Sequence, residues 1–177
     1  RHNLIAAAML DLPFGRGRQW LADAPPLLDG VVGGWSFATV WKAHSGFPIT
    51  ITAPDQSQTG ARSGRPDQVG TAEGPREVGP GHYWFNTSAF VLPQPGTFGN
   101  AGVGVVRGPG LDVVDMSVTK RVHRVRGAAI DIRADAFNAL NVPVFNAPDR
   151  SLTSSTFGQV LSTQAARELQ LSARLSF

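Results

Sequence analysis

The segment Glu168-Leu169-Gln170-Leu171-Ser172-Ala173-Arg174-Leu175-Ser176-Phe177 gives the clearest structural signal in this sequence. Apolar and polar residues alternate along it, and the side chains of an extended strand alternate between its two faces. One face would therefore carry Leu169, Leu171, Ala173, Leu175 and Phe177. About ten residues also suffice for a tilted strand to cross the hydrocarbon core of a membrane. The pattern predicts a β-strand over residues 168–177, and both soluble and membrane-spanning sheets show such alternation.

The same alternation recurs in four upstream segments. It predicts five strands in all, at about residues 2–12, 34–53, 111–122, 127–140 and 168–177. The second strand is expected to bend at Ser45-Gly46-Phe47-Pro48, because Gly and Pro inside a strand mark a bulge or a kink. A short helix within residues 20–32 would be interrupted by Pro25-Pro26.

The connections between these strands alternate in length. Residues 123–126 form a short turn, residues 13–33 an intermediate connection, and residues 54–110 and 141–167 two long loops. Transmembrane barrels have short periplasmic turns and long extracellular loops, and both long loops fall on the same side here. A loop as long as 54–110 is poor evidence for a compact soluble domain. We therefore predict an all-β fold, an antiparallel up-and-down transmembrane β-barrel with apolar faces toward lipid and polar faces toward a lumen.

The composition agrees with a strand-rich chain in a membrane. Charged residues make up 16% of the 177 residues, below the roughly 25% of soluble domains. No apolar run reaches the eighteen or so residues of a membrane helix, so a spanning chain would have to be a barrel. The net charge of +3 is scattered, which argues against a nucleic-acid partner. The absence of cysteine excludes disulfides and thiolate metal sites.

No residue set predicts catalysis. Asp131 and Asp135 share a strand face with Arg133 between them, but four residues along a strand span roughly 13 Å. Paired catalytic carboxylates lie at most about 9.5 Å apart. Asp131, Arg133 and Asp135 are therefore interpreted as a luminal polar face. The four histidines lack metal-ligand spacing, and we expect no enzyme activity, cofactor or metal.

Aromatic residues cluster in the longer loop. Trp84, Phe85, Phe90 and Phe98 could form a ligand-contact surface, or they could pack the loop and give it a small core of its own. Trp35, Trp41 and Phe177 could belong to the aromatic girdles that mark membrane interfaces.

An ordered set of motifs resembles the closing part of TonB-dependent receptor barrels. The resemblance is to receptors that carry a carboxypeptidase-regulatory-like domain before the plug, the Oar-like group, and it covers essentially the whole chain. The motifs are Leu12-Pro13-Phe14-Gly15-Arg16-Gly17-Arg18, Gly33-Gly34-Trp35, Ser45-Gly46-Phe47-Pro48-Ile49-Thr50, Trp84-Phe85-Asn86-Thr87-Ser88-Ala89-Phe90, Thr97-Phe98-Gly99-Asn100-Ala101-Gly102, Arg107-Gly108-Pro109-Gly110, Arg133-Ala134-Asp135-Ala136-Phe137-Asn138-Ala139-Leu140-Asn141 and Phe157-Gly158-Gln159-Val160.

The resemblance implies a location in the outer membrane of a Gram-negative bacterium and active uptake of a scarce ligand through extracellular loops. Family barrels have about twenty-two strands, and about eight is the minimum for outer-membrane barrels. We therefore expect a C-terminal portion of a longer receptor, which would reach the TonB system through missing N-terminal parts. The other expected partners are outer-membrane lipid, an unidentified ligand and the barrel-assembly machinery. In the family this machinery reads the terminal strand, here Phe177, Leu175, Ala173, Leu171 and Leu169.

The alternative is a soluble all-β sandwich that recognises glycans through the loop aromatics. The two hypotheses differ in where the apolar strand faces go. A sandwich buries them against a second sheet, whereas a barrel turns them toward lipid.

Overall fold

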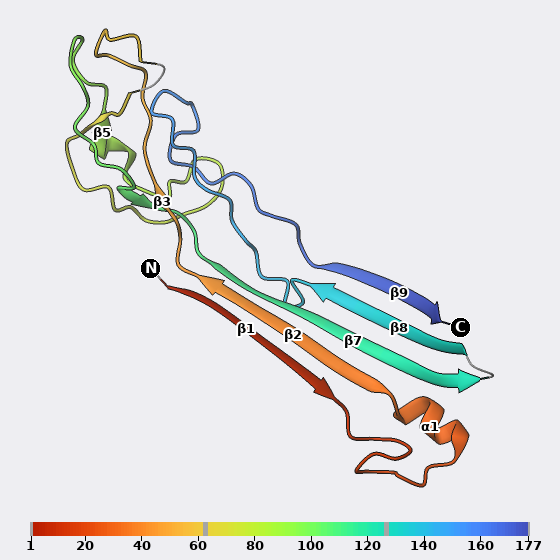
Figure 1. Cartoon of the computed structure of the whole chain (residues 1–177). Helices are drawn as coiled ribbons and strands as arrows, with labels where there is room; N and C mark the ends of the chain where they lie inside the picture. Colours follow the sequence, from red (N-terminus) through yellow and green to blue (C-terminus); the bar gives the residue numbers. More distant parts are fainter. Residues whose placement is uncertain (1, 62–63, 126–127, 177) are drawn as a thin grey trace. The chain divides into compact units, whose positions relative to one another are not determined.

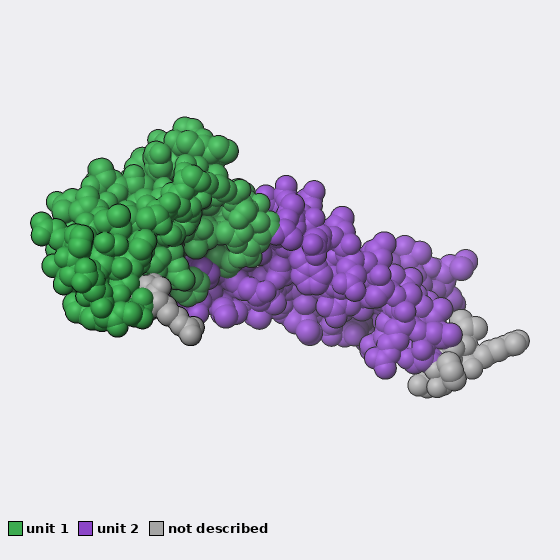
Figure 2. Space-filling view, turned by 90° about the horizontal axis from the view of Figure 1, so that it is seen from above, with its two compact units in different colours: residues 1, 45–111, 143–164 green, residues 2–44, 112–142, 165–177 purple. Residues whose placement is uncertain are grey.

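The computed structural model describes residues 2–61, 64–125 and 128–176, which form two compact units (Figure 2). Unit 1 consists of Ser45–Leu111 and Pro143–Gln164, the two long connections of the sequence. Unit 2 consists of His2–His44, Asp112–Val142 and Ala165–Phe177, and it contains the long strands. Among the described residues, no helix combines the length and the apolar character needed to span a membrane.

Unit 2 is built on one five-stranded sheet, in the order β1-β2-β7-β8-β9 (Figure 1). The strands are β1 (Asn3–Asp11), β2 (Trp35–His44), β7 (Leu111–Val125), β8 (Ala128–Phe137) and β9 (Glu168–Ser176). The pairs β1–β2, β7–β8 and β8–β9 are antiparallel. The predicted all-β, antiparallel fold class is thereby confirmed.

The second strand is shorter than predicted. β2 ends at His44, and the predicted continuation is the two-residue strand β3 (Pro48–Ile49) in unit 1. A Cβ on Gly46 would overlap the carbonyl oxygen of Gly108, so the close approach of these two segments just after β2 requires a glycine at position 46. β3 then pairs with β6 (Val106–Arg107) instead of extending the main sheet.

The short helix α1 (Pro26–Val32) lies between β1 and β2. We expected Pro25-Pro26 to interrupt a helix within residues 20–32, but the helix begins at Pro26. Proline is tolerated in the first helical turn, where its missing N–H has no intrahelical partner.

The strand register places apolar residues on one side of the sheet. Leu10 lies opposite Phe37 and Ala6 opposite Trp41, while Ala134 lies opposite both Val118 and Leu171. We call this side the apolar face. The other side, the polar face, carries Asp131 opposite Arg121 and Arg174, with Arg133 opposite Thr119 and Ser172.

Unit 1 has a hydrophobic core of its own. Besides β3 and β6 it contains the strands β4 (Asp67–Gln68) and β5 (Phe90–Val91), which pair with each other, and the 3-10 turn η1 (Thr87–Ala89). The core consists of Ile49, Ile51, Ala72, Phe85, Ala89, Phe90, Ala101, Val106 and Phe157. Phe157 comes from the second long connection, so both connections contribute to one core.

Candidate functional site: an exposed apolar face and a polar pocket

The apolar face of the sheet is open to its surroundings. All nine residues of β1 and all nine of β9 are exposed. Leu171, in the middle of β9, has 80% of its surface accessible, and Ile132 on β8 has 47%. Leucine and isoleucine side chains exposed along a whole sheet face are unusual on a protein surface that contacts only water.

Among the side chains that the structure describes, two charged residues interrupt the apolar face, and each contacts a tryptophan. The indole N–H of Trp41 donates a hydrogen bond of 2.6 Å to the carboxylate of Asp112. The ammonium nitrogen of Lys120 lies 5.2 Å from the centre of the Trp35 ring, a cation–π contact. Lys120 also donates hydrogen bonds to the carbonyl oxygens of Val31 and Gly33 beside α1. Both charges are therefore held by partners within unit 2.

These two pairs bracket the apolar face along β7. Asp112 and Lys120 are eight residues apart, which is about 27 Å along a strand. With a strand tilt of about 40°, the span along a barrel axis is on the order of 20 Å, near the apolar band of about 25 Å on outer-membrane barrels. Trp35 and Trp41, which contact these two charges, are the residues that the sequence offered as candidates for the aromatic girdles.

The polar face carries a row of ion pairs. Arg121 on β7 pairs with Asp131 on β8 at 2.8 Å. Arg133 pairs with Asp135 on its own strand at 2.7 Å. This pair of Arg133 therefore stays within one strand and does not reach a neighbouring one. Arg121, which the sequence did not single out, supplies the cross-strand pair instead.

The four loop aromatics fall into different environments. Phe85 and Phe90 are 2% and 4% exposed and meet Phe157 in edge-to-face contacts, with ring centroids 5.2 and 6.4 Å apart. Trp84 is half-buried, and its indole N–H donates to the carbonyl oxygen of Arg107 at 2.6 Å. Phe98 is 73% exposed. Of the four rings, only Phe98 is thus presented largely to the surface, and the other three help to order the loop.

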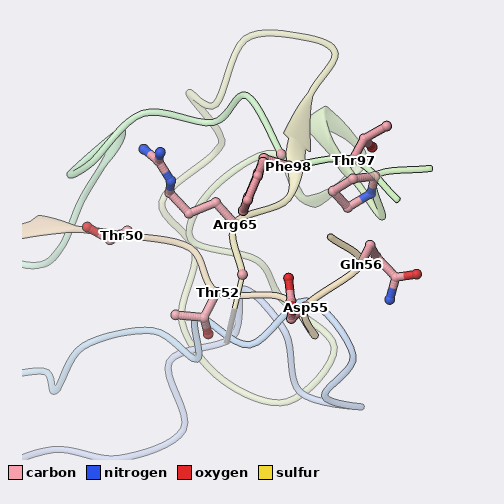
Figure 3. Close-up of a pocket in the computed structure, with 10 residues that line it drawn as sticks. Thr50, Thr52, Asp55, Gln56, Arg65, Thr97 and Phe98 are labelled. Atoms are coloured by element: carbon pink, nitrogen blue, oxygen red, sulfur yellow. The ribbon is translucent and has the colours of Figure 1, made fainter. Parts of the chain in front are cut away.

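Phe98 borders an open polar pocket in unit 1, with a cavity volume of about 270 Å³ (Figure 3). Its lining consists of Thr50, Thr52, Asp55, Gln56, Gly64, Arg65, Pro93, Thr97, Phe98 and Gly99. Asp55 accepts hydrogen bonds from the hydroxyl and the backbone N–H of Ser57, at 2.6 and 3.0 Å. These bonds lower the pKa of Asp55, so its carboxylate is charged at neutral pH. An aromatic ring beside charged, amide and hydroxyl groups can hold a small polar ligand by stacking and hydrogen bonding.

The terminal-strand residues lie together on the apolar face. Leu169, Leu171, Ala173 and Leu175 pair in sequence with Ala136, Ala134, Ile132 and Ile130 of β8. Phe177 lies outside the described residues. Among the residues that the structure describes, no group of three or more His, Cys, Asp or Glu side chains could hold a metal ion.

An antiparallel sheet with one exposed apolar face and one ion-paired face is typical of membrane β-barrel proteins. Residues 1–170 match the family described as an outer membrane beta barrel domain, and the chain belongs to that family. It is accordingly an outer-membrane protein. Comparison with curated proteins and with solved structures gave no match.

Proposed function

We propose that this chain is part of a TonB-dependent receptor that takes up a scarce ligand across the outer membrane of a Gram-negative bacterium. The five strands supply part of the barrel wall, with the apolar face against lipid and the polar face toward the lumen. Closure requires about eight strands or more, so further strands of the same barrel complete the wall. The TonB system acts through segments outside this chain, and the barrel-assembly machinery reads β9.

Three observations support this proposal. The ordered motifs from Leu12 to Val160 are similar to those of the receptor family. The family match to an outer membrane beta barrel domain supports the coarser class. The two long connections form one unit with a shared core and an open polar pocket. This observation supports a receptor function most directly. Binding residues occur disproportionately on loops that a rigid scaffold positions.

Binding to TonB tests the receptor class directly. We expect the full-length protein, reconstituted in vesicles, to bind the purified periplasmic domain of TonB from the same organism. An outer-membrane porin in matched vesicles is the control. Binding no stronger than that of the porin would contradict the proposal.

The pocket beside Phe98 provides a test of ligand capture. A panel of a ferric siderophore, cobalamin, a maltooligosaccharide and a peptide would be screened by fluorescence titration of the full-length protein. For a ligand that binds, we expect Phe98→Ala to weaken affinity several-fold. Val103→Ala, at a residue that is 80% exposed in the same unit and does not line this pocket, should leave it unchanged. Equal effects of the two variants would argue against this pocket as the capture site.

The soluble sandwich hypothesis has less support. A sandwich buries its apolar faces between two sheets, but the described residues of unit 2 contain a single sheet whose apolar face is exposed. Cell fractionation of the full-length protein separates the two hypotheses. Recovery as a soluble monomer that does not shift its mobility on a gel after heating would favour the sandwich.

A further inference from the structure

The connection between β1 and β2 carries an exposed apolar helix. In α1 (Pro26–Val32), Leu27 is 89% exposed, Val31 68% and Leu28 41%. None of the seven helix residues is buried. A helix this short is unstable by itself. Contacts with the rest of unit 2 therefore stabilise α1 in a position that leaves its apolar side chains exposed.

Asp29 fixes which side of the helix faces the protein. Its carboxylate accepts a hydrogen bond of 2.6 Å from the backbone N–H of Arg16. Gly15, at φ of 107°, and Gly33 both lie so close that a Cβ on either would collide with this carboxylate. Successive helix residues are rotated by about 100°. Leu27 and Val31 therefore point to the side opposite Asp29, away from the rest of unit 2.

The C-terminal end of α1 is tied to the apolar face of the sheet. The carbonyl oxygen of Val31 accepts hydrogen bonds from the indole N–H of Trp35 at 2.8 Å and from the ammonium group of Lys120 at 3.3 Å. Trp35 precedes Phe37 by two residues and Lys120 lies opposite Ile132, so both belong to the apolar face. The C-terminal end of α1 thus lies next to the surface that we propose to face lipid.

We infer that α1 lies in the headgroup layer of the membrane at this end of the barrel, with Leu27, Leu28 and Val31 inserted among the lipid chains. This inference rests on the proposed lipid-facing orientation of the sheet. Amphipathic helices at membranes bury their apolar side to a depth of about 5–10 Å. Trp35 and Lys120 are residue types that favour the interface.

The size of the surface favours lipid over a protein partner. A stable protein interface buries about 800 Å² on each side, far more than three side chains on a seven-residue helix can offer. Lipid requires no such minimum area, and the neighbouring apolar face already extends the contact. The same helix also explains how Lys120 is tolerated on that face, since its ammonium group is bonded to carbonyl oxygens beside α1.

Spin-label accessibility tests the inference. The chain contains no cysteine, so Leu27→Cys and Val31→Cys would each carry a single nitroxide label, in a full-length protein without other cysteines. The protein would be reconstituted in vesicles of phosphatidylethanolamine and phosphatidylglycerol. We expect labels at 27 and 31 to be several-fold more accessible to oxygen, which concentrates in lipid, than to a water-soluble nickel complex. Asp23→Cys, on the same connection and exposed, should show the reverse preference.

Leu171→Cys on β9 separates failure of this inference from failure of the proposed orientation. If the label at 171 reports lipid while those at 27 and 31 report water, the helix inference is wrong and the proposed orientation stands. If the labels at 27 and 31 are shielded from both reagents, a protein covers the helix and the inference is also wrong. If the label at 171 itself reports water, the proposed orientation fails as well. All four substituted positions are exposed, so folding should survive, and heat-modifiable gel mobility would verify it.

Discussion

At the scale of single residues, the two charged side chains on the apolar face are tolerated there because each has a hydrogen-bond partner. Lys120 is 9% exposed and bonded to two carbonyl oxygens, whereas Asp112 is bonded to an indole N–H. A periodicity argument identifies such residues only as exceptions. Their partners come from segments distant in the sequence, such as Val31 for Lys120, which is why the sequence could not supply the explanation.

Removal of the Lys120 ammonium group should destabilise unit 2. Lys120→Met leaves the carbonyl oxygens of Val31 and Gly33 without this donor, and we expect a loss of about 1–3 kcal/mol in the free energy of unfolding. Urea unfolding of the full-length protein in vesicles, followed by tryptophan fluorescence, would measure it. Lys42→Met removes an ion pair with Asp115 whose lysine is 49% exposed, and it should cost about 0–1 kcal/mol. A smaller effect for Lys120→Met than for Lys42→Met would contradict this account.

Asp149 predicts a pH dependence in unit 1. Burial acts to raise the pKa of Asp149, but hydrogen bonds from Ser154, Ser151 and Thr156 outweigh it and lower the pKa. An aspartate is protonated in the unfolded chain below about pH 3.9. The stabilisation is therefore fully present above that pH and is lost as the pH falls through the lower folded-state pKa. Hydrogen exchange of residues 146–160, corrected for intrinsic rates, should be constant from neutral pH to about pH 5 and accelerate in stronger acid. In Asp149→Ala the acid-induced acceleration should disappear.

At the scale of elements, β9 offers a paired test of its two faces. Leu171 and Ser172 are adjacent in the middle of the strand, on the apolar and polar faces respectively. Leu171→Arg should destabilise the protein in vesicles by about 2–4 kcal/mol, the cost of an arginine near the bilayer midplane. Ser172→Arg, directed toward the lumen, should have a much smaller effect in the same unfolding measurement. Equal costs would mean that the strand does not separate lipid from lumen.

Unit 1 offers a second pair of substitutions, in the aromatic cluster whose role the sequence did not decide. Phe85→Ala should destabilise unit 1 by about 3–5 kcal/mol, because it leaves a cavity in the core beside Phe157. Phe98→Ala should change stability by well under 1 kcal/mol, because its ring is 73% exposed. Protease resistance of the loop unit across a urea series would compare them. Similar losses would contradict the assignment of one ring to the core and the other to the pocket.

Strand periodicity predicts the elements of this fold well wherever neighbours within the sheet determine the structure. The strands around residues 3–11, 128–137 and 168–176 lie close to the predicted positions. The bend after His44 was expected, but its result was not, because Ile49 pairs with Val106 of a distant segment. A small core around Phe85 and Phe90 was one of the two alternatives for the loop aromatics. The contribution of Phe157 could not be predicted, because it comes from a second irregular connection that has no period to detect.

At the scale of the whole molecule, the chain divides its apolar residues between two environments. Unit 1 buries them in a core of its own, whereas unit 2 exposes most of them along one face of a sheet, with Ile5 and Met9 of β1 on the other face. The chain belongs to an outer-membrane barrel family, and in the receptor that we propose this division separates a water-exposed ligand unit from a lipid-exposed wall. In the same proposal the polar face, with its Arg121–Asp131 and Arg133–Asp135 pairs, belongs to the lumen.

The central claim is that the five-stranded sheet of unit 2 faces lipid with one side and water with the other. It is tested most directly by labelling each position from 169 to 176 in turn with a single cysteine-linked fluorophore, in the full-length protein in vesicles. Quenching by lipids that carry bromine on their acyl chains would be measured against quenching by aqueous iodide. We predict strong lipid quenching at Leu169, Leu171, Ala173 and Leu175, and iodide quenching at the other four positions, Gln170, Ser172, Arg174 and Ser176. Uniform quenching by iodide along the strand would contradict the claim.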